Sequence, residues 1–282
     1  MSRTEASLRP QKGTLVKRHK LSTRLWHWAS AAIIVVMLMS GLMIFNAHPR
    51  LYWGIDGANT DPAWLEIGAS IGATGEKGYF RLGQTELTTT GVLGLSAGPR
   101  DSIAKRAFPQ WATLPGEEDL AKARRWHLSF AWLLATGTLL FGIWSIANGH
   151  VRRDLLPHKS ELRPGHICGQ IKQHASFHLP QGLEARSYNT LQKLVYLGVS
   201  GLLIPALILS GLTMSPWINA VVPWLVDVFG GRQSARSIHF IAAFLIVLFV
   251  IVHLVMVVVA GPVNEIRSMI TGWFRLPEER RK

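Results

Sequence analysis

Four long apolar stretches constrain this chain more than any other feature. Their interiors are nearly free of Asp, Glu, Lys and Arg, and each approaches or exceeds the roughly 20 helical residues that cross about 30 Å of hydrocarbon. The stretches are approximately Trp26–Phe45, Trp126–Ile146, Leu191–Met214 and Ser237–Ala260. The sequence therefore predicts an all-α integral membrane protein built as a four-helix transmembrane bundle. The one or two soluble domains that 282 residues would otherwise suit are not expected.

The basic charge of the chain is concentrated in three segments, and this predicts its orientation. Segments 1–24, 147–193 and 261–282 together hold 19 Lys and Arg against 7 Asp and Glu, whereas segment 46–125 is neutral. Positive residues concentrate on the cytoplasmic side of a membrane. We therefore expect a multi-pass protein of the bacterial inner membrane with both termini in the cytoplasm. The net charge of +13 is interpreted as topology and not as a nucleic-acid-binding surface.

The connections between the spans complete the expected organisation. An insertion of about 80 residues is too long for a bare loop, so we expect a compact, partly structured periplasmic cap. Pro262–Phe274 is expected to form an amphipathic helix on the inner membrane surface. The expected regions are a cytoplasmic basic tail (1–24), a transmembrane domain (25–260) with its periplasmic insertion (46–125) and cytoplasmic loop (147–190), and a cytoplasmic tail (261–282).

Two proline-containing segments are expected to depart from regular spanning helices. Pro205 lies inside the third stretch and should kink it, because proline removes one backbone hydrogen bond. Pro216–Phe229 contains two prolines and two tryptophans. It is too interrupted to span, and we expect an interfacial segment on the outer side.

Four of the eleven histidines lie within the spans, where ionisable side chains are costly and tend to be functional. His239 and His253 are 14 residues apart, which corresponds to about 21 Å of helical rise and to faces within roughly 40°. Because the spans alternate in direction, His127 shares the outer depth of His239, and His27 shares the inner depth of His253. A single such histidine could be an ordinary core residue. Two pairs at matched depths favour two hemes, each held by two imidazoles in the bundle core.

An arginine precedes three of these histidines by three residues. The arginines are Arg24, Arg124 and Arg236. Residues at i and i+3 share a helix face, so each guanidinium would lie near the headgroups, where heme propionates should emerge. Each could instead be an ordinary arginine reaching toward the membrane surface. Three in register with three candidate ligands favour heme, and the chain has no Cys-x-x-Cys-His for covalent c-type attachment.

These motifs match a known family over all four spans and the C-terminal segment. They are RLWHW at Arg24–Trp28, RRWH at Arg124–His127, RSIHF at Arg236–Phe240, the placement of His253, and GPVNEIRSMITGWF at Gly261–Phe274. The chain resembles the bacterial di-heme cytochrome b561 family, which includes the b-type subunits of nickel–iron hydrogenases and the gamma subunit of formate dehydrogenase. This resemblance implies that the four histidines ligate two hemes b per chain. The insertion, with HPRLYWG at His48–Gly54, resembles that of thiosulfate-reductase or molybdoenzyme cytochrome b subunits.

The resemblance implies electron transfer between the membrane quinone pool and a periplasmic oxidoreductase partner. It assigns no catalytic residue to the chain itself. Two axial imidazoles leave no open coordination site, which suits one-electron transfer. By family analogy, quinone would exchange electrons near His27, His253 and Arg24. The alternatives are a free-standing b561-type quinol oxidoreductase without a partner and a non-redox membrane anchor. A transporter would need broken helices or internal repeats, and only Pro205 points that way.

Overall fold

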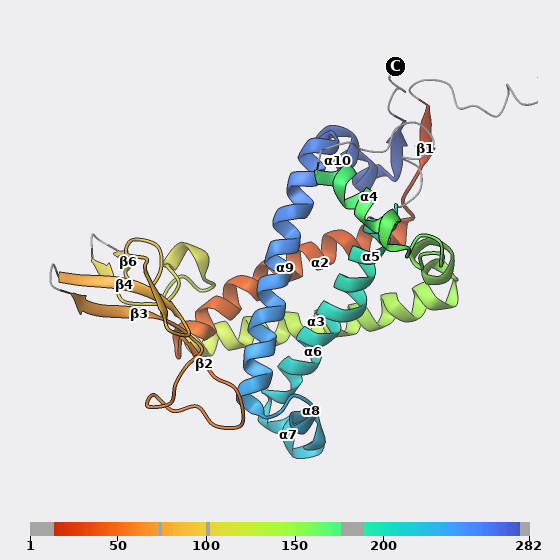
Figure 1. The fold of residues 1–282 in the computed structure, drawn as a ribbon. Helices are drawn as coiled ribbons and strands as arrows, with labels where there is room; N and C mark the ends of the chain where they lie inside the picture. The colour runs from red at the N-terminus through yellow and green to blue at the C-terminus, as the bar shows by residue number, and fades with distance from the viewer. Residues whose placement is uncertain (1–13, 73–74, 100–101, 176–188, 277–282) are drawn as a thin grey trace, which may run out of the picture. The chain divides into compact units, whose positions relative to one another are not determined.

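The computed structural model describes residues 14–72, 75–99, 102–175 and 189–276, and each predicted span forms a long helical segment (Figure 1). Each segment is long and apolar enough to cross a membrane, and most of each apolar window is not buried by protein, as lipid-facing helices require. The segments are α2 (Leu21–Asn46), α3 (Leu120–Ala147), the run from α5 (Thr190–Gly198) through η5 (Val199–Leu203) to α6 (Ile204–Thr213), and α9 (Arg232–Ala260).

The chain divides into two compact units, and every long helical segment contributes to both of them. The terminal unit contains both chain ends and comprises residues 1–29, 138–203 and 246–282. The cap unit contains the long insertion and comprises residues 30–137 and 204–245.

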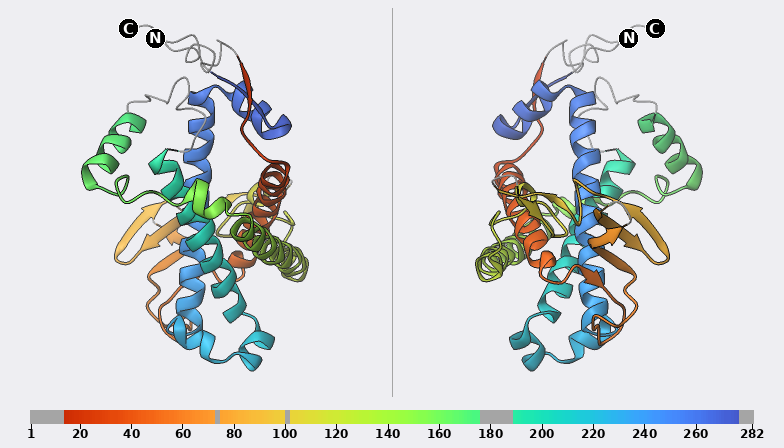
Figure 2. Two further views of the ribbon diagram at one scale, coloured as in Figure 1. Left: turned by 90° about the vertical axis from the view of Figure 1, so that its right-hand side faces the viewer. Right: turned by 90° about the vertical axis from the view of Figure 1, so that its left-hand side faces the viewer.

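The cap unit corrects the expectation of an all-α protein, because the insertion forms antiparallel sheets. The larger sheet has four strands in the order β2-β3-β4-β5, drawn in orange in Figures 1 and 2. Gly83, with φ of 57°, lies in the two-residue turn between β4 and β5, a conformation that glycine adopts without strain. The strands are β2 (Arg50–Leu51), β3 (Leu65–Gly72), β4 (Gly75–Leu82), β5 (Thr85–Thr88) and the small pair β6 (Ser96–Ala97) and β7 (Ile103–Ala104).

A buried carboxylate organises the larger sheet. Glu66 on β3 accepts hydrogen bonds from Tyr79 Oη (2.7 Å), Arg50 Nη2 (2.6 Å) and Arg81 Nη1 (2.9 Å). Burial by itself would raise the pKa of Glu66, but these hydrogen bonds and positive charges hold the pKa below its usual value. Apolar packing completes the core of the cap, with Phe45 at the end of α2 among its members. The buried cluster is Phe45, Leu51, Leu65, Ile67 and Ala107.

Helix boundaries in the cap unit follow local sequence signals. Asp119 precedes α3, and its Oδ1 accepts a hydrogen bond from the Lys122 backbone N–H (2.8 Å), as an N-cap residue does. The segment expected to be interfacial forms two short helices, α7 (Pro216–Val221) and α8 (Trp224–Val228), which expose Trp217 and Trp224. The short 3-10 helix η2 (Gln110–Ala112) lies between the sheets and α3.

The interruption expected at Pro205 takes the form of a π-helical segment. This segment, η5, ends two residues before the proline. Proline has no backbone N–H and its ring clashes with the carbonyl four residues earlier, so the helix must widen locally.

In the terminal unit, two strands that are far apart in the sequence pair with each other. β1 (Leu15–Lys17) pairs antiparallel with β8 (Trp273–Arg275), and Figure 2 shows the red first strand beside the blue C-terminal segment. Arg18 reinforces this pairing, since its Nη1 lies 3.3 Å from Glu265 Oε2 and its guanidinium 4.5 Å from the Phe274 ring centroid. Thus part of the expected basic tail is a strand, while residues 1–13 and 277–282 lie outside the described residues.

The remaining elements of the terminal unit are helical. The helix expected over Pro262–Phe274 is shorter: α10 covers Pro262–Thr271, whereas Trp273 and Phe274 belong to β8. The 147–190 loop contains the π-helical η3 (Val151–Leu155) and α4 (Pro164–Ala175). Residues 176–188 of this loop lie outside the described residues. His19 is buried between β1 and α2, and burial together with the charge of Arg18 lowers the pKa of His19 to about 4.

Candidate heme sites

The cap unit brings together His127 of α3 and His239 of α9. Their ring centroids are 6.2 Å apart and their planes are inclined by 64°. Metal–nitrogen bonds of about 2 Å, plus about 1 Å from each nitrogen to its ring centre, put two opposed imidazoles roughly 6 Å apart across one metal ion. The observed separation therefore fits two axial ligands of one iron.

Hydrogen bonds to α2 fix the orientation of the His127 ring. Its Nδ1 lies 3.1 Å from Met37 O and 3.1 Å from Ser40 Oγ. The single hydroxyl hydrogen of Ser40 is donated to Val36 O (2.7 Å), so Ser40 Oγ accepts at His127. His127 Nδ1 must then carry the proton, which leaves the lone pair of Nε2 for a metal.

The His239 ring is held in the same way by α6. Its Nδ1 lies 3.0 Å from Leu207 O and 3.1 Å from Ser210 Oγ, and Ser210 donates to Ala206 O (2.5 Å). A carbonyl and a serine three residues later thus meet each imidazole. Both rings are held with Nδ1 as donor and Nε2 available as ligand.

Two glycines allow these helices to approach the rings. A Cβ added to Gly41 would lie 3.2 Å from His127 Cε1, and one added to Gly211 would lie 3.3 Å from His239 Cε1. Both are tighter than ordinary van der Waals contact, so a side chain would press on the imidazole. Because glycine has no side chain, each helix can approach its imidazole closely enough for the carbonyl and serine oxygens to contact Nδ1.

The sequence analysis assigned no role to Ser40, Gly41, Ser210 or Gly211. The available signal was a repeated pattern in the first and third spans, MLMSG at 37–41 and LILSG at 207–211. A third Ser-Gly pair, Ser200–Gly201, lies in the terminal unit. Ser200 donates to its own helix at Tyr196 O, and a Cβ added to Gly201 would meet nothing within 4 Å.

The terminal unit brings together His27 of α2 and His253 of α9. Their ring centroids are also 6.2 Å apart, with planes inclined by 56°. Trp28 lies edge-on to His27 at 5.1 Å, and Phe249 stacks on His253 at 5.7 Å. The separation again fits one metal ion between two imidazoles.

The three arginines expected at the propionates differ in their surroundings. Arg236 donates a hydrogen bond to His48 O, whereas Arg124 is exposed on α3. Arg24 is half-buried against Gly272, where an added Cβ would lie 3.3 Å from Arg24 Nη1. Within the described ranges, no carboxylate forms an ion pair with Arg24, Arg124 or Arg236. Their donors are thus compatible with external carboxylates.

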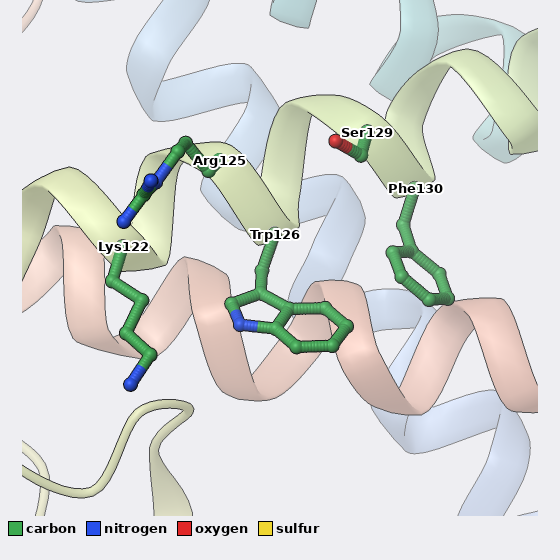
Figure 3. Close-up of a pocket in the computed structure, with 5 residues that line it drawn as sticks. All are labelled: Lys122, Arg125, Trp126, Ser129 and Phe130. Atoms are coloured by element: carbon green, nitrogen blue, oxygen red, sulfur yellow. The ribbon is translucent and has the colours of Figure 1, made fainter.

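An open hollow on the surface of α3 is unrelated to the histidines. Figure 3 shows that its side chains all come from this one helix, and none of them is a metal ligand. The lining residues are Lys122, Arg125, Trp126, Ser129 and Phe130.

Comparisons with known proteins identify the family. The family described as prokaryotic cytochrome b561 matches residues 18–272. The chain belongs to this family. The match covers all four histidines and all three arginines named above. The family is one of membrane cytochromes, so the chain is a multi-pass membrane cytochrome b that carries heme b and transfers electrons.

Three relatives place the chain near subunits of redox complexes. It is 30% identical over 151 residues to a protein of Azospira oryzae named as a protein-methionine-sulfoxide reductase subunit, YedZ1, covering 53% of this chain and 71% of the relative. It is 25% and 24% identical over 186 residues to proteins of Azotobacter vinelandii and Azotobacter chroococcum named as Ni/Fe-hydrogenase B-type cytochrome subunits, covering 60% of this chain and 76% of each. No solved structure matches the chain.

Proposed function

We propose that this chain is a di-heme cytochrome b that transfers electrons between the quinone pool and a periplasmic oxidoreductase. The observation that carries the proposal is the pair of matched imidazole separations, 6.2 Å at His127–His239 and 6.2 Å at His27–His253. Each pair would supply two imidazole ligands to a heme, and the heme would supply one-electron transfer.

The chain's own residues have distinct roles in this proposal. His127 and His239 would hold one heme b, and His27 and His253 would hold the other. Ser40 and Ser210 orient the first pair through the hydrogen bonds at Nδ1. The bound hemes supply one-electron redox chemistry, and the protein supplies the ligands, their orientation and an apolar surrounding.

The proposed orientation follows from charge. Basic residues are concentrated at both termini and in the 147–190 loop, which we place in the cytoplasm of a bacterial inner membrane. The cap and the His127–His239 pair are then on the periplasmic side. The His27–His253 pair is on the cytoplasmic side.

A periplasmic partner is supported by the surface of the cap. The relatives are named as subunits of a reductase and of hydrogenases, which favours an oxidoreductase as the partner. Large apolar side chains exposed at a protein surface commonly mark interaction sites. Those of the cap that are more than half exposed include Trp53, Ile55, Ile71, Val92, Ile103 and Trp111.

Quinone is proposed to exchange electrons near His27, His253 and Arg24. Polar atoms beside this pair support a site for a polar headgroup. Arg24 Nε and His19 Nδ1 are buried and have no hydrogen-bond partner among the described residues. Such atoms are costly unless a ligand or water satisfies them.

The test of quinone coupling uses the full-length protein in lipid vesicles. A short-chain quinol added without oxygen should reduce the hemes to a large share of the amplitude that dithionite gives. Hemes that dithionite reduces and quinol leaves oxidised would contradict the quinone assignment. Purification in mild detergent addresses the partner: a copurifying oxidoreductase supports the complex, whereas a lone chain with quinol activity supports the free-standing alternative.

A further inference from the structure

The HPRLYWG motif at His48–Gly54 lies along the start of α9, within the cap unit. Hydrogen bonds join it to the first turns of the helix at both of its ends. They run from Arg236 Nη2 to His48 O, from Ser237 Oγ to Tyr52 O (2.5 Å) and from Gly54 N to Ser234 Oγ (2.7 Å). The motif is therefore fixed beside the helix that also carries His239.

Two polar side-chain atoms of this motif are buried without a hydrogen-bond acceptor. His48 Nε2 and Tyr52 Oη have no acceptor within the part of the chain that the structure describes, and Arg50, the group beside the Tyr52 hydroxyl, is a donor only. Tyr52 is only 2% exposed, and leaving a buried hydroxyl without an acceptor is unfavourable. The buried Tyr79 of the cap, in contrast, donates to Glu66. The two unsatisfied atoms therefore point to a missing acceptor.

The two rings are held firmly in place. They stack with centroids 5.8 Å apart and planes inclined by 28°. A Cβ added to Gly57 would lie 2.5 Å from the Tyr52 ring, so the backbone packs directly on it. Rigid rings that present polar atoms are typical of a binding site with preset geometry.

The charges around the motif favour an anion. Arg236 lies one turn before His239, and no described carboxylate pairs with it, whereas Arg50 is paired with Glu66 at 2.6 Å. Burial, followed by the charges of Arg236 and Arg50, lowers the pKa of His48. A neutral His48 still donates one hydrogen bond. The donors of His48 and Tyr52, which lack an acceptor, lie beside the guanidinium of Arg236, and together these groups suit a carboxylate.

We propose that His48, Tyr52 and Arg236 bind a carboxylate, the propionate of the heme held by His127 and His239. This inference rests on the proposed function, because it needs that pair to ligate a heme. The HPRLYWG motif then has a defined role: it supplies two hydrogen-bond donors beside the arginine that the RSIH motif provides.

The first test compares Tyr52→Phe with the matched control Tyr79→Phe in the full-length protein. Tyr52→Phe removes one hydroxyl and keeps the packed ring. Donors to a propionate stabilise the more negative reduced state, so the midpoint potential of one heme should fall. We expect about a threefold change in the ratio of oxidised to reduced heme at a fixed potential, or roughly 30 mV for one electron. The propionate bending band in resonance Raman spectra should shift as well. The control should change neither.

The second test varies His48. His48→Leu should lower the same midpoint potential, and His48→Gln, which keeps a donor near the Nε2 position, should restore most of the shift. Unchanged potentials and an unchanged propionate band in both Tyr52→Phe and His48→Leu would overturn this proposal alone. Wild-type protein that binds no heme at the His127–His239 pair would overturn the proposed function and this inference together.

Discussion

The two histidine pairs have the same separation and different surroundings. Both pairs of ring centroids lie 6.2 Å apart, with planes inclined by 64° at His127–His239 and 56° at His27–His253. The first pair is held by carbonyl and serine oxygens on neighbouring helices, and two aromatic side chains, Trp28 and Phe249, lie beside the rings of the second pair. Helix packing sets the spacing of the imidazoles, and the contacts at Nδ1 of His127 and His239 set the tautomer and basicity of those two rings.

This difference predicts distinct redox behaviour at the two pairs. Hydrogen-bond acceptors at Nδ1 increase the electron donation of an imidazole to its metal, which favours the oxidised state. Ser40, Gly41, Ser210 and Gly211 contact the rings of the His127–His239 pair. Substitutions at the serines and glycines of α2 and α6 should therefore affect one heme and spare the other.

The largest difference between the two histidine pairs is expected from Gly211→Val, which should disturb the His127–His239 pair alone. The added Cβ would lie 3.3 Å from His239 Cε1, and its methyl groups would push the ring away. Overpacking of this kind costs about 1–3 kcal/mol, and displaced ligands lose their metal. We expect the heme content to fall by about one heme per chain, measured by the pyridine hemochrome assay.

Gly201→Val is the matched control for Gly211→Val. Gly201 also follows a serine in the same helical run, and a Cβ there would meet nothing within 4 Å. Its valine variant should keep the wild-type heme content. Equal heme losses in the two variants would indicate a general helix defect and would contradict the close-approach explanation.

A smaller effect is expected from Ser210→Ala. Loss of the Oγ acceptor reduces the basicity of His239, so the midpoint potential of its heme should rise. A hydrogen bond contributes about 1 kcal/mol, which corresponds to roughly 40 mV for one electron. The midpoint potential should therefore rise by no more than this amount. Potentiometric titration of both hemes measures the shift.

Ser200→Ala serves as the control for Ser210→Ala, since Ser200 donates to its own helix at Tyr196 O in the same way. It should leave both potentials unchanged. If Ser210→Ala moved both hemes equally, or moved neither, the polar anchoring of the His127–His239 pair would not be what distinguishes the two pairs.

Glu66→Gln is expected to have no effect on the hemes. It tests the stability of the larger sheet in the cap. Because hydrogen bonds lower the folded-state pKa of Glu66, its stabilisation is present above the unfolded pKa of about 4.3 and is lost as the pH falls through the folded-state pKa. Near pH 7 the variant should lose about 2 kcal/mol of protection in β3 and β4, measured by amide hydrogen exchange. This difference from wild type should shrink below about pH 4.

Glu76→Gln provides the comparison for Glu66→Gln. Glu76 is more exposed and pairs with Lys105 at the surface, where an ion pair contributes little. A loss of protection as large as that of Glu66→Gln would contradict the importance of burial in the Glu66 network.

The sequence predicted the spans well because membrane thickness imposes a minimum length on each apolar stretch. The pairing of His127 with His239 and of His27 with His253 followed from alternating helix direction, and the structure brings those rings together. Their role as heme ligands stays a prediction. Helix ends were less predictable, since α9 begins at Arg232, five residues before the expected span.

The sheets were not predicted, for identifiable reasons. β3 and β4 contain several glycines, which weaken the alternation of apolar and polar residues that marks a strand. β1 and β8 pair Lys17 with Trp273, two positions that no local pattern connects. Ser40 and Ser210 were missed because a serine in an apolar helix acquires its role only from the neighbouring helix. Arg124 shows that spacing three residues before a histidine does not by itself bury a guanidinium.

The most direct measurement is the dithionite-reduced minus oxidised spectrum of the purified protein, with heme quantified per chain. We predict about two b-type hemes in wild type, and about one in each of His239→Ala and His253→Ala, with different spectral components lost in the two variants. Well-folded wild-type protein with no heme, or single variants that keep both hemes, would contradict the assignment of the two pairs as heme ligands.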